Sequence, residues 1–283
     1  MLKVQEVSCK TLLNKSSLTD FTLNCYMGCS HGCLYCYARY MKKFKDRPED
    51  WGQFVDVKVN APEALERQIQ RLKKNPKKRP NEASVFMGSV GDCWQPVEAK
   101  YKLSRACLGL LLEAGFKVDI LTKSALVCRD LELLEAYKTP RLGMTLTTLD
   151  LGLQKALEPQ ASEPLERLET LRKAGKKGIK TWAFLGPLIP GITDTRANLD
   201  GLFRGLRGLR LAYIYVDRLN PRWGVLEALK RGLSRGEGYL DFRHMLYTAS
   251  NPKRYAEYSQ RLKENCLEAA GLAGLADKLT FCF

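Results

Sequence analysis

The fold is decided by a stretch that begins with the apolar run Ser84-Val85-Phe86-Met87-Gly88, which predicts a short strand. Residues 100–114 follow, with apolar side chains at intervals of three and four, and predict a helix that ends at Gly115. The next segment, Lys117-Val118-Asp119-Ile120-Leu121-Thr122, again predicts a strand. A strand, a helix and a second strand in this order favour parallel strands joined by a right-handed crossover.

The same alternation extends on both sides of this stretch. Further strands are expected at 21–23, 141–147, 179–185 and 211–216, with helices at 130–137, 164–174 and 198–206. Strands separated mostly by helices predict an α/β fold, an incomplete (β/α)6 TIM-like barrel, whose active site lies at the C-terminal ends of the strands. A doubly wound sheet is the alternative. Residues 1–217 are expected to form the barrel, and residues 218–283 a helical C-terminal extension packed on it.

The composition is that of a globular protein. The chain has 283 residues, of which 45% are hydrophobic, and this excludes disordered and fibrous classes. No apolar run approaches the roughly 18 residues that a membrane-spanning helix needs. The N-terminal residues have no signal-peptide pattern, so we expect a cytoplasmic protein without membrane contact.

Ten cysteines need an explanation in a reducing compartment, where five disulfides are not expected. Three of them form the pattern Cys29-x3-Cys33-x2-Cys36 directly after a predicted strand, and clustered thiols indicate metal binding. Three thiolates at this spacing can hold an iron–sulfur cluster and leave one iron open to a small molecule. Zinc is the weaker alternative, because zinc sites usually pair two knuckles and no second Cys-x2-Cys exists. Cys25 is a candidate fourth ligand that would close the open iron.

This spacing, with Tyr35 just before the last cysteine, resembles the radical S-adenosylmethionine superfamily. The flanking residues resemble more specifically its spore photoproduct lyase-related branch, often labelled DNA repair photolyase-like. The segments that carry the resemblance are 24–39, 91–98, 122–130, 145–150 and 157–159.

The resemblance implies a mechanism. Cys29, Cys33 and Cys36 would hold a [4Fe–4S] cluster whose open iron binds S-adenosylmethionine. One-electron reduction would cleave S-adenosylmethionine to a 5′-deoxyadenosyl radical, which abstracts a hydrogen atom from the substrate. A reducing partner such as a ferredoxin or flavodoxin is implied as the electron donor.

The resemblance also assigns contacts with S-adenosylmethionine at the ends of the predicted strands. Gly88 and Ser89 would contact the methionyl amino group, and Lys123 would pair with the methionyl carboxylate. The other assigned residues would contact the carboxylate, the ribose or the adenine; they are Tyr35, Thr145, Thr147, Ile189 and Asp194. A solvated lysine and a polar strand end are the structural alternatives for Lys123 and the two threonines.

Two residues are candidates for a catalytic role with the substrate. The family commonly has proline where this chain has Cys93, and spore photoproduct lyase uses a cysteine on this loop as a hydrogen donor to the product radical. That cysteine aligns more nearly with Ser89 than with Cys93, so both positions are carried as catalytic candidates.

The charge is the second functional clue. The formal net charge is +15, and basic side chains recur at Arg204, Arg207 and Arg210, which predicts a helical stripe, and at Lys42, Lys43 and Lys45. Basic faces with interleaved aromatics suit nucleic acid, whose phosphates supply affinity while aromatic rings stack on bases. A charged surface that serves only solubility is the alternative.

Three functions follow from these observations. The leading hypothesis is a radical S-adenosylmethionine enzyme that repairs a lesion or modifies a base in nucleic acid. The second keeps the cofactors and changes the substrate to a protein, a peptide or a small metabolite, since fold similarity does not determine the substrate. The third is an iron–sulfur protein without enzymatic activity that binds nucleic acid or senses redox state.

Overall fold

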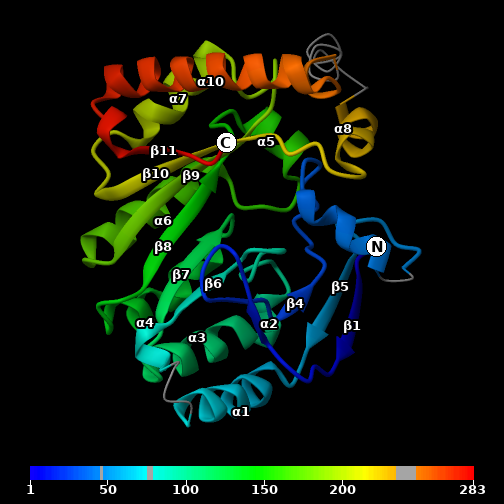
Figure 1. Cartoon of the computed structure of the whole chain (residues 1–283), viewed down its shortest axis with the longest axis vertical. Helices are drawn as coiled ribbons and strands as arrows, with labels where there is room; N and C mark the ends of the chain where they lie inside the picture. Colours follow the sequence, from blue (N-terminus) through cyan, green and yellow to red (C-terminus); the bar gives the residue numbers. More distant parts are fainter. Residues whose placement is uncertain (45–46, 75–78, 234–246) are drawn as a thin grey trace.

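The computed structural model describes residues 1–44, 47–74, 79–233 and 247–283. Its main element is an eight-stranded sheet with the order β11-β10-β9-β8-β7-β6-β3-β2 (Figure 1). All the strands expected from the sequence are present as neighbours that pair in parallel. They are β3 (Phe21–Leu23), β6 (Ser84–Met87), β7 (Lys117–Thr122), β8 (Arg141–Leu146), β9 (Lys180–Leu188) and β10 (Leu211–Arg218).

The sheet is open and does not close into a barrel. One end is extended by β11 (Leu279–Phe281), parallel to β10, and the other by β2 (Leu13–Lys15), antiparallel to β3. The prediction that residues 218–283 are helical is therefore wrong at the C-terminus. Without β11, the backbone groups at the edge of β10 would lack hydrogen-bond partners. β11 pairs with this edge, and the amide of Cys282 donates to Val216 O at 3.0 Å.

The helices include those that the sequence predicted, with two differences. The helix expected at 100–114 is divided, because Lys102 has a φ of 54° and separates α2 from α3. A helix at 151–157 was not expected. The α-helices are α1 (Ala61–Lys73), α2 (Glu98–Tyr101), α3 (Leu103–Glu113), α4 (Leu131–Glu135), α5 (Leu151–Leu157), α6 (Pro164–Lys176), α7 (Arg196–Leu206), α8 (Val225–Leu233) and α10 (Pro252–Ala273). The 3-10 helices are η1 (Tyr37–Phe44), η2 (Pro80–Glu82), η3 (Ala125–Asp130) and η4 (Ala276–Lys278).

A second, three-stranded sheet supports the segment that carries the cysteines. Its order is β1 (Lys3–Val7), β5 (Phe54–Lys58) and β4 (Tyr26–Met27). The sequence did not predict this sheet, because β1 is exposed and has no regular alternation of polar and apolar residues, and β4 is only two residues long. It places the end of β4 next to β5, directly before Cys29.

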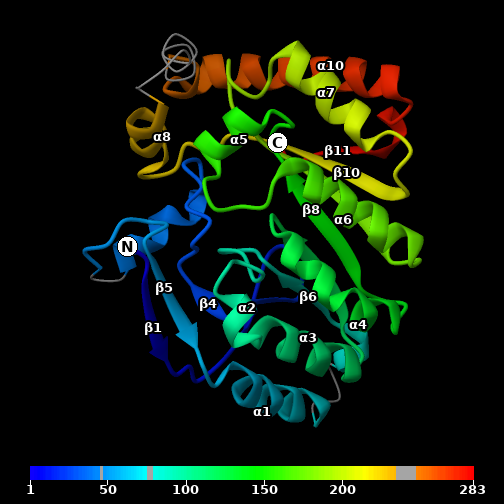
Figure 2. The same ribbon diagram turned by 180° about the vertical axis from the view of Figure 1, so that it is seen from behind.

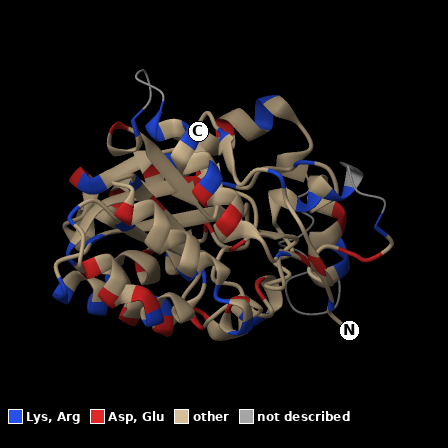
Figure 3. Ribbon diagram, turned by 90° about the horizontal axis from the view of Figure 1, so that it is seen from below, with Lys and Arg blue, Asp and Glu red and all other residues tan. Residues whose placement is uncertain are grey.

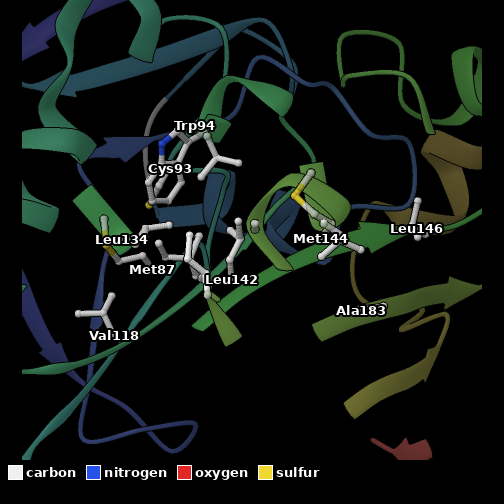
Figure 4. Packing of buried hydrophobic residues seen from close by; sticks show 14 of the residues in the cluster. Met87, Cys93, Trp94, Val118, Leu134, Leu142, Met144, Leu146 and Ala183 are labelled. Carbon is white, nitrogen blue, oxygen red and sulfur yellow. The ribbon is translucent and has the colours of Figure 1, made fainter. Parts of the chain in front are cut away.

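Alternate residues of the main sheet form the hydrophobic core. Val118, Met87 and Leu142 face the helices that cover one side of the sheet, and Figure 4 shows them packed with Cys93 and Trp94. Helices α3, α6 and α7 supply the other half of this core, and Figure 2 shows α3 and α6 in front of the strands. Burial of this apolar surface is the main favourable term in the folding free energy.

The opposite face of the sheet is filled by aromatic rings. Trp182 on β9 lies 6.4 Å from Phe86 on β6 and 5.5 and 5.6 Å from Tyr213 and Tyr215 on β10, measured between ring centroids. Gly143 on β8 makes room for it, because a Cβ there would lie 2.3 Å from the indole. Trp182 is buried, whereas the rings of Phe86, Tyr213 and Tyr215 are partly exposed.

The basic residues are dispersed in the structure. Lys and Arg are interspersed with Asp and Glu in Figure 3. The predicted helical stripe is only partly present, because α7 ends at Leu206 and leaves Arg207 and Arg210 in the connection to β10, although both are exposed. Lys45 and the side chain of Lys43 lie outside the described residues. None of the helices that the structure describes is long and apolar enough to cross a membrane.

Candidate functional site

The three motif cysteines lie on the cluster loop, residues 28–36, which connects β4 to η1. Cys29 and Cys33 are each 6% exposed, and Cys36 is partly buried. The loop begins at Gly28, whose φ of 85° and close approach to β5 both require glycine: a Cβ there would lie 2.3 Å from Phe54 O. The short sheet therefore determines where the loop starts.

Gln95, which is fully buried, holds the backbone of this loop. Its Oε1 accepts a hydrogen bond from Ser30 N at 2.8 Å, and its Nε2 donates to Gly28 O at 3.2 Å. Gln95 belongs to segment 91–98, which follows β6 and was singled out in the sequence by resemblance alone. Its side chain replaces the backbone pairing that an irregular buried loop lacks.

The carboxylate of Asp92 joins the cluster loop to the ends of β6 and β7. Asp92 Oδ2 lies 3.2 Å from His31 Nε2 and accepts from Lys123 N at 2.7 Å, while Oδ1 accepts from Thr122 Oγ1 at 2.7 Å. Burial by itself raises the pKa of Asp92, but the imidazole and the hydrogen bonds outweigh it and lower the pKa to about 2. His31 therefore supports the loop and is not placed as a cluster ligand.

Tyr35 belongs to a second buried network. Its hydroxyl donates to the carboxylate of Glu158 and lies 3.2 Å from Thr147 Oγ1, which also donates to Glu158, at 2.7 Å. Arg167 forms an ion pair with the same carboxylate and donates to Thr145 O at 3.0 Å. Although burial raises it, the pKa of Glu158 is lowered by Arg167 and then by Lys123. The predicted residues Tyr35, Thr145 and Thr147 are thus brought together.

Lys123 stands at the end of β7 beside this network. Its Nζ lies 5.7 Å from the ring centroid of Tyr35. Burial lowers the pKa of Lys123, but the thiol of Cys33 and the carboxylate of Glu158 act in the opposite direction, and the net pKa is raised. The ammonium group therefore stays charged at neutral pH, next to the cluster loop.

Gly88 and Ser89 lie at the end of β6, where the prediction placed them. Gly88 has a φ of 99°, and a Cβ there would lie 2.2 Å from Leu121 O on β7. Ser89 Oγ accepts a hydrogen bond from Asn24 Nδ2 at 3.3 Å, and Ser89 O accepts one from the hydroxyl of Tyr37. This strand end is therefore tied to the end of β3 and to the start of η1.

Ile189 and Asp194, in the turn after β9, are placed differently from each other. Ile189 is fully buried in one apolar cluster with Cys33 and Tyr35, and its contact with the adenine stays a prediction. Asp194 Oδ1 accepts a hydrogen bond from Gly191 N at 2.7 Å. Burial and then the Asp194 carboxylate raise the pKa of the Tyr258 hydroxyl on α10. Asp194 thus shapes the turn and its contact with the C-terminal helix.

Cys25 and Cys93 lie in the main core instead of on the cluster loop. Cys25 Sγ is 3.7 Å from Cys107 Sγ, and this contact together with burial raises the pKa of Cys25 well above its usual range. Cys93 is 1% exposed, its Sγ lies 3.6 Å from Leu23 O, and burial raises its pKa as well. The catalytic role of Cys93 stays a prediction, for a side chain that lies within the core.

Comparisons with known proteins identify the family of this chain and its fold. The family model described as the radical SAM superfamily matches residues 23–199. The chain belongs to the radical SAM superfamily. It is 30% identical over 195 residues to an uncharacterised protein of Methanocaldococcus jannaschii, with 68% of this chain and 70% of the relative covered. It is 32% identical over 231 residues to an uncharacterised protein of Acidianus two-tailed virus, with 77% and 73% covered.

Solved structures show the radical SAM fold. A cysteine-to-serine variant of spore photoproduct lyase matches with a TM-score of 0.68 and 13% identity over 99% of this chain and 82% of the lyase. The lyase complexed with dinucleoside spore photoproduct matches with a TM-score of 0.61 and 15% identity, covering 83% of this chain and 67% of the lyase. Streptococcus suis SuiB bound to S-adenosylmethionine matches with 0.51 and 17%, covering 78% of this chain and 47% of SuiB.

Membership of the radical SAM superfamily makes this protein an enzyme and sets aside the reading without activity. It implies a [4Fe–4S] cluster, reductive cleavage of S-adenosylmethionine and radical chemistry. Cys29, Cys33 and Cys36 fit this cluster, because iron–sulfur clusters are held by cysteine thiolates. All three lie on the cluster loop, and burial, then Asp92, then the thiols of Cys33 and Cys36 raise the pKa of Cys29. Binding of iron reverses such a shift, because the ligand is the thiolate.

The arrangement of the thiols is also informative. In the part of the chain that the structure describes, no three Cys, His, Asp or Glu residues converge where one metal ion would be held. A four-iron cluster takes each thiolate on a different iron, so its ligands do not have to converge on one point.

Sequence reasoning missed several residues of this site. Glu158, Asp92 and Gln95 lay within matched segments but were given no role, and Arg167 lay outside them. Asp217, at the end of β10, was also missed: it shares the aromatic face with Tyr213 and Tyr215, and burial raises its pKa to about 6. The signal for Asp217 in the sequence was its position as a carboxylate directly after the apolar strand predicted at 211–216.

Proposed function

We propose that this radical SAM enzyme acts on nucleic acid, by hydrogen abstraction in lesion repair or base modification. Cys29, Cys33 and Cys36 would be the cluster ligands. The observation that carries the radical chemistry is the placement of a buried, charged Lys123 and the Tyr35–Glu158 network beside the thiols of Cys33 and Cys36. β3 and β6 to β10 would be the strands of the predicted (β/α)6 partial barrel.

The cluster, once bound, supplies the electron that cleaves S-adenosylmethionine and so produces the radical that takes a hydrogen atom from the substrate. The chain's own residues bind and orient the reactants. Lys123 has the charge to pair with the methionyl carboxylate. The backbone at Gly88, free of a side chain, can approach the methionyl amino group. The rings around Trp182 line the face of the sheet opposite the main core.

Two observations support nucleic acid as the substrate class. The net charge of +15 favours a polyanion. One structural relative is a lyase complexed with a dinucleoside spore photoproduct. Ser89, at the strand end, and Cys93, in the core behind it, stay the proposed catalytic positions, and the thiol of Cys93 is the one with the chemistry of a hydrogen-atom donor. A cytoplasmic location stays part of the proposal, since a low-potential cluster needs a reducing compartment.

The first experiment tests the radical chemistry. The protein is reconstituted anaerobically with iron and sulfide, reduced with dithionite in the presence of S-adenosylmethionine, and analysed for 5′-deoxyadenosine. Wild-type protein should form 5′-deoxyadenosine, and Cys29→Ala should form none. An intact cluster without this product would contradict the assigned cofactor site.

The second experiment tests the substrate class. Binding to single-stranded and duplex oligonucleotides is measured from low to physiological salt, and affinity should fall steeply as salt rises, because phosphate contacts release counterions. Absence of binding at low salt would overturn nucleic acid as substrate. The search would then move to peptides and small metabolites.

A further inference from the structure

A groove of about 360 Å³ lies between η1 and α8, with Lys42 on the first helix and Arg231 on the second among its lining residues. Two tryptophans and three cations line the groove: Trp51, Trp223, Arg39, Lys42 and Arg231. The proposed reaction uses none of these residues.

The floor of the groove leads directly to the cluster site. Trp51 is 5% exposed and packs in one apolar cluster with Cys29, Cys36 and Ala38. Its indole also acts on the thiol of Cys36, whose pKa it lowers against the stronger effect of burial. One side chain therefore separates the groove from Cys36, and electron transfer through protein slows steeply with distance.

The walls of the groove carry an excess of positive charge. Lys42 and Arg231 share the carboxylate of Asp50, at 3.3 and 3.5 Å. Arg39 is 6% exposed, and its Nε is buried without a hydrogen-bond partner in the described structure. Glu227 is the other acidic residue of the lining, so cations outnumber carboxylates. Trp223, half exposed, stands at the rim.

We propose that this groove is the docking site of the electron donor, a small acidic protein that carries a one-electron iron–sulfur centre. The inference rests on the proposed function, which needs one electron per cleavage. In the docked complex, one electron leaves the carrier, which is oxidised, and reduces the cluster; no bond forms or breaks in this step. A small, charge-steered interface is typical of such transient electron-transfer complexes.

The position of the groove favours a carrier over nucleic acid. The radical has to meet its substrate at the strand ends, where Lys123, Thr147 and Ser89 lie. None of these three residues lines the groove. A ligand in the groove would face Cys36 through Trp51. This place suits the delivery of electrons and not the transfer of hydrogen.

The test uses the cluster-loaded enzyme with Lys42→Glu and Arg231→Glu combined. The matched control combines Arg67→Glu and Arg71→Glu, two exposed residues of α1, which lies at the other end of the molecule in Figure 1. Two quantities are measured: the affinity for oxidised ferredoxin, and the rate at which reduced ferredoxin bleaches the cluster absorbance. Dithionite serves as a small reductant that needs no docking site.

The groove variant should lose about tenfold or more in both affinity and rate, with the deficit shrinking at high salt. Dithionite should reduce both variants like wild type, and the α1 control should bind ferredoxin like wild type. Unchanged ferredoxin affinity and rate, or an equal loss in the control, would overturn the inference. So would a loss of oligonucleotide affinity with ferredoxin reduction intact. Neither readout involves S-adenosylmethionine, so failure to form 5′-deoxyadenosine would count against the proposed function alone.

Discussion

Nε2 of His31 lies 3.2 Å from Oδ2 of Asp92, and this contact joins the cluster loop to the loop that follows β6. The same carboxylate accepts a hydrogen bond from Lys123 N at 2.7 Å, so it also holds the end of β7. Three segments distant in sequence therefore depend on one buried negative charge.

Replacement of this charge should destabilise the protein. Asp92→Asn should lower the free energy of unfolding by about 2 kcal/mol at pH 7, because the neutral amide loses the imidazole and the charge-assisted hydrogen bonds. Urea unfolding of the cluster-free chain measures this, with the exposed Asp277→Asn as control. Equal stability of the two variants would show that the carboxylate contributes nothing.

The stabilisation by Asp92 should weaken in acid. The pKa of Asp92 falls from 3.8 to about 2 on folding, so its stabilisation is present above about pH 4. It is lost as the pH falls through 2, where the folded state also takes up the proton. The difference between wild type and Asp92→Asn should therefore shrink on acidification below pH 4.

Cys25 and Cys29 should behave differently on loss of their thiols. Cys25 contacts Cys107 in the core, whereas Cys29 lies on the cluster loop, so Cys25→Ala should keep its iron after reconstitution and Cys29→Ala should lose most of it. Iron content and the visible absorbance of the cluster report this directly. Loss of iron in Cys25→Ala alone would make Cys25 a ligand and close the proposed open iron.

Lys123 should contribute to the binding of S-adenosylmethionine through its charge. Lys123→Met should weaken binding about tenfold or more, because a charge-assisted contact with a carboxylate is lost in a buried site. Lys117→Met, an exposed lysine at the other end of the same strand, is the control. Calorimetric titration of the cluster-loaded protein compares them, and equal affinities would remove Lys123 from the site.

Asp217 should act on stability in the opposite direction from Asp92. Burial raises its pKa from 3.8 to about 6, so the folded state holds a proton that the unfolded state releases between these values. Stability should therefore fall as the pH rises from about 4 to 6. Asp217→Asn should remove this dependence and be more stable by about 2 kcal/mol above pH 6.

Thermal unfolding across pH 4 to 8 measures this prediction. The exposed Glu257→Gln on α10 is the control and should keep the wild-type slope. A wild-type slope in Asp217→Asn would show that another group titrates in this range.

Local patterns in the sequence predicted the parallel strands and the cluster loop well. The runs at β6, β7 and β8 are apolar and short, and each is followed or preceded by a helical periodicity that neighbours in the chain establish. The spacing of Cys29, Cys33 and Cys36 is likewise a property of one short segment. The order of the strands did not follow from these patterns, because a doubly wound sheet satisfies the same crossover preference; the structure shows it.

Other elements could not be predicted because their stability comes from distant partners. Strand β11 consists of three residues and exists because β10 offers it an open edge. Strands β1 and β5 have no distinctive pattern and pair across about fifty residues of sequence, from Lys3 to Phe54. The division of the expected helix at Lys102 depends on a single left-handed residue.

The sequence by itself determined the strand–helix alternation and the triad of thiols, because each depends on residues that are close together along the chain. The tertiary structure alone decided the electrostatics of the site. Tyr35 meets Glu158 across a separation of 123 residues, and His31 meets Asp92 across loops of different strands. Such contacts depend on which strand ends lie side by side, and burial then gives them strength that no local pattern records.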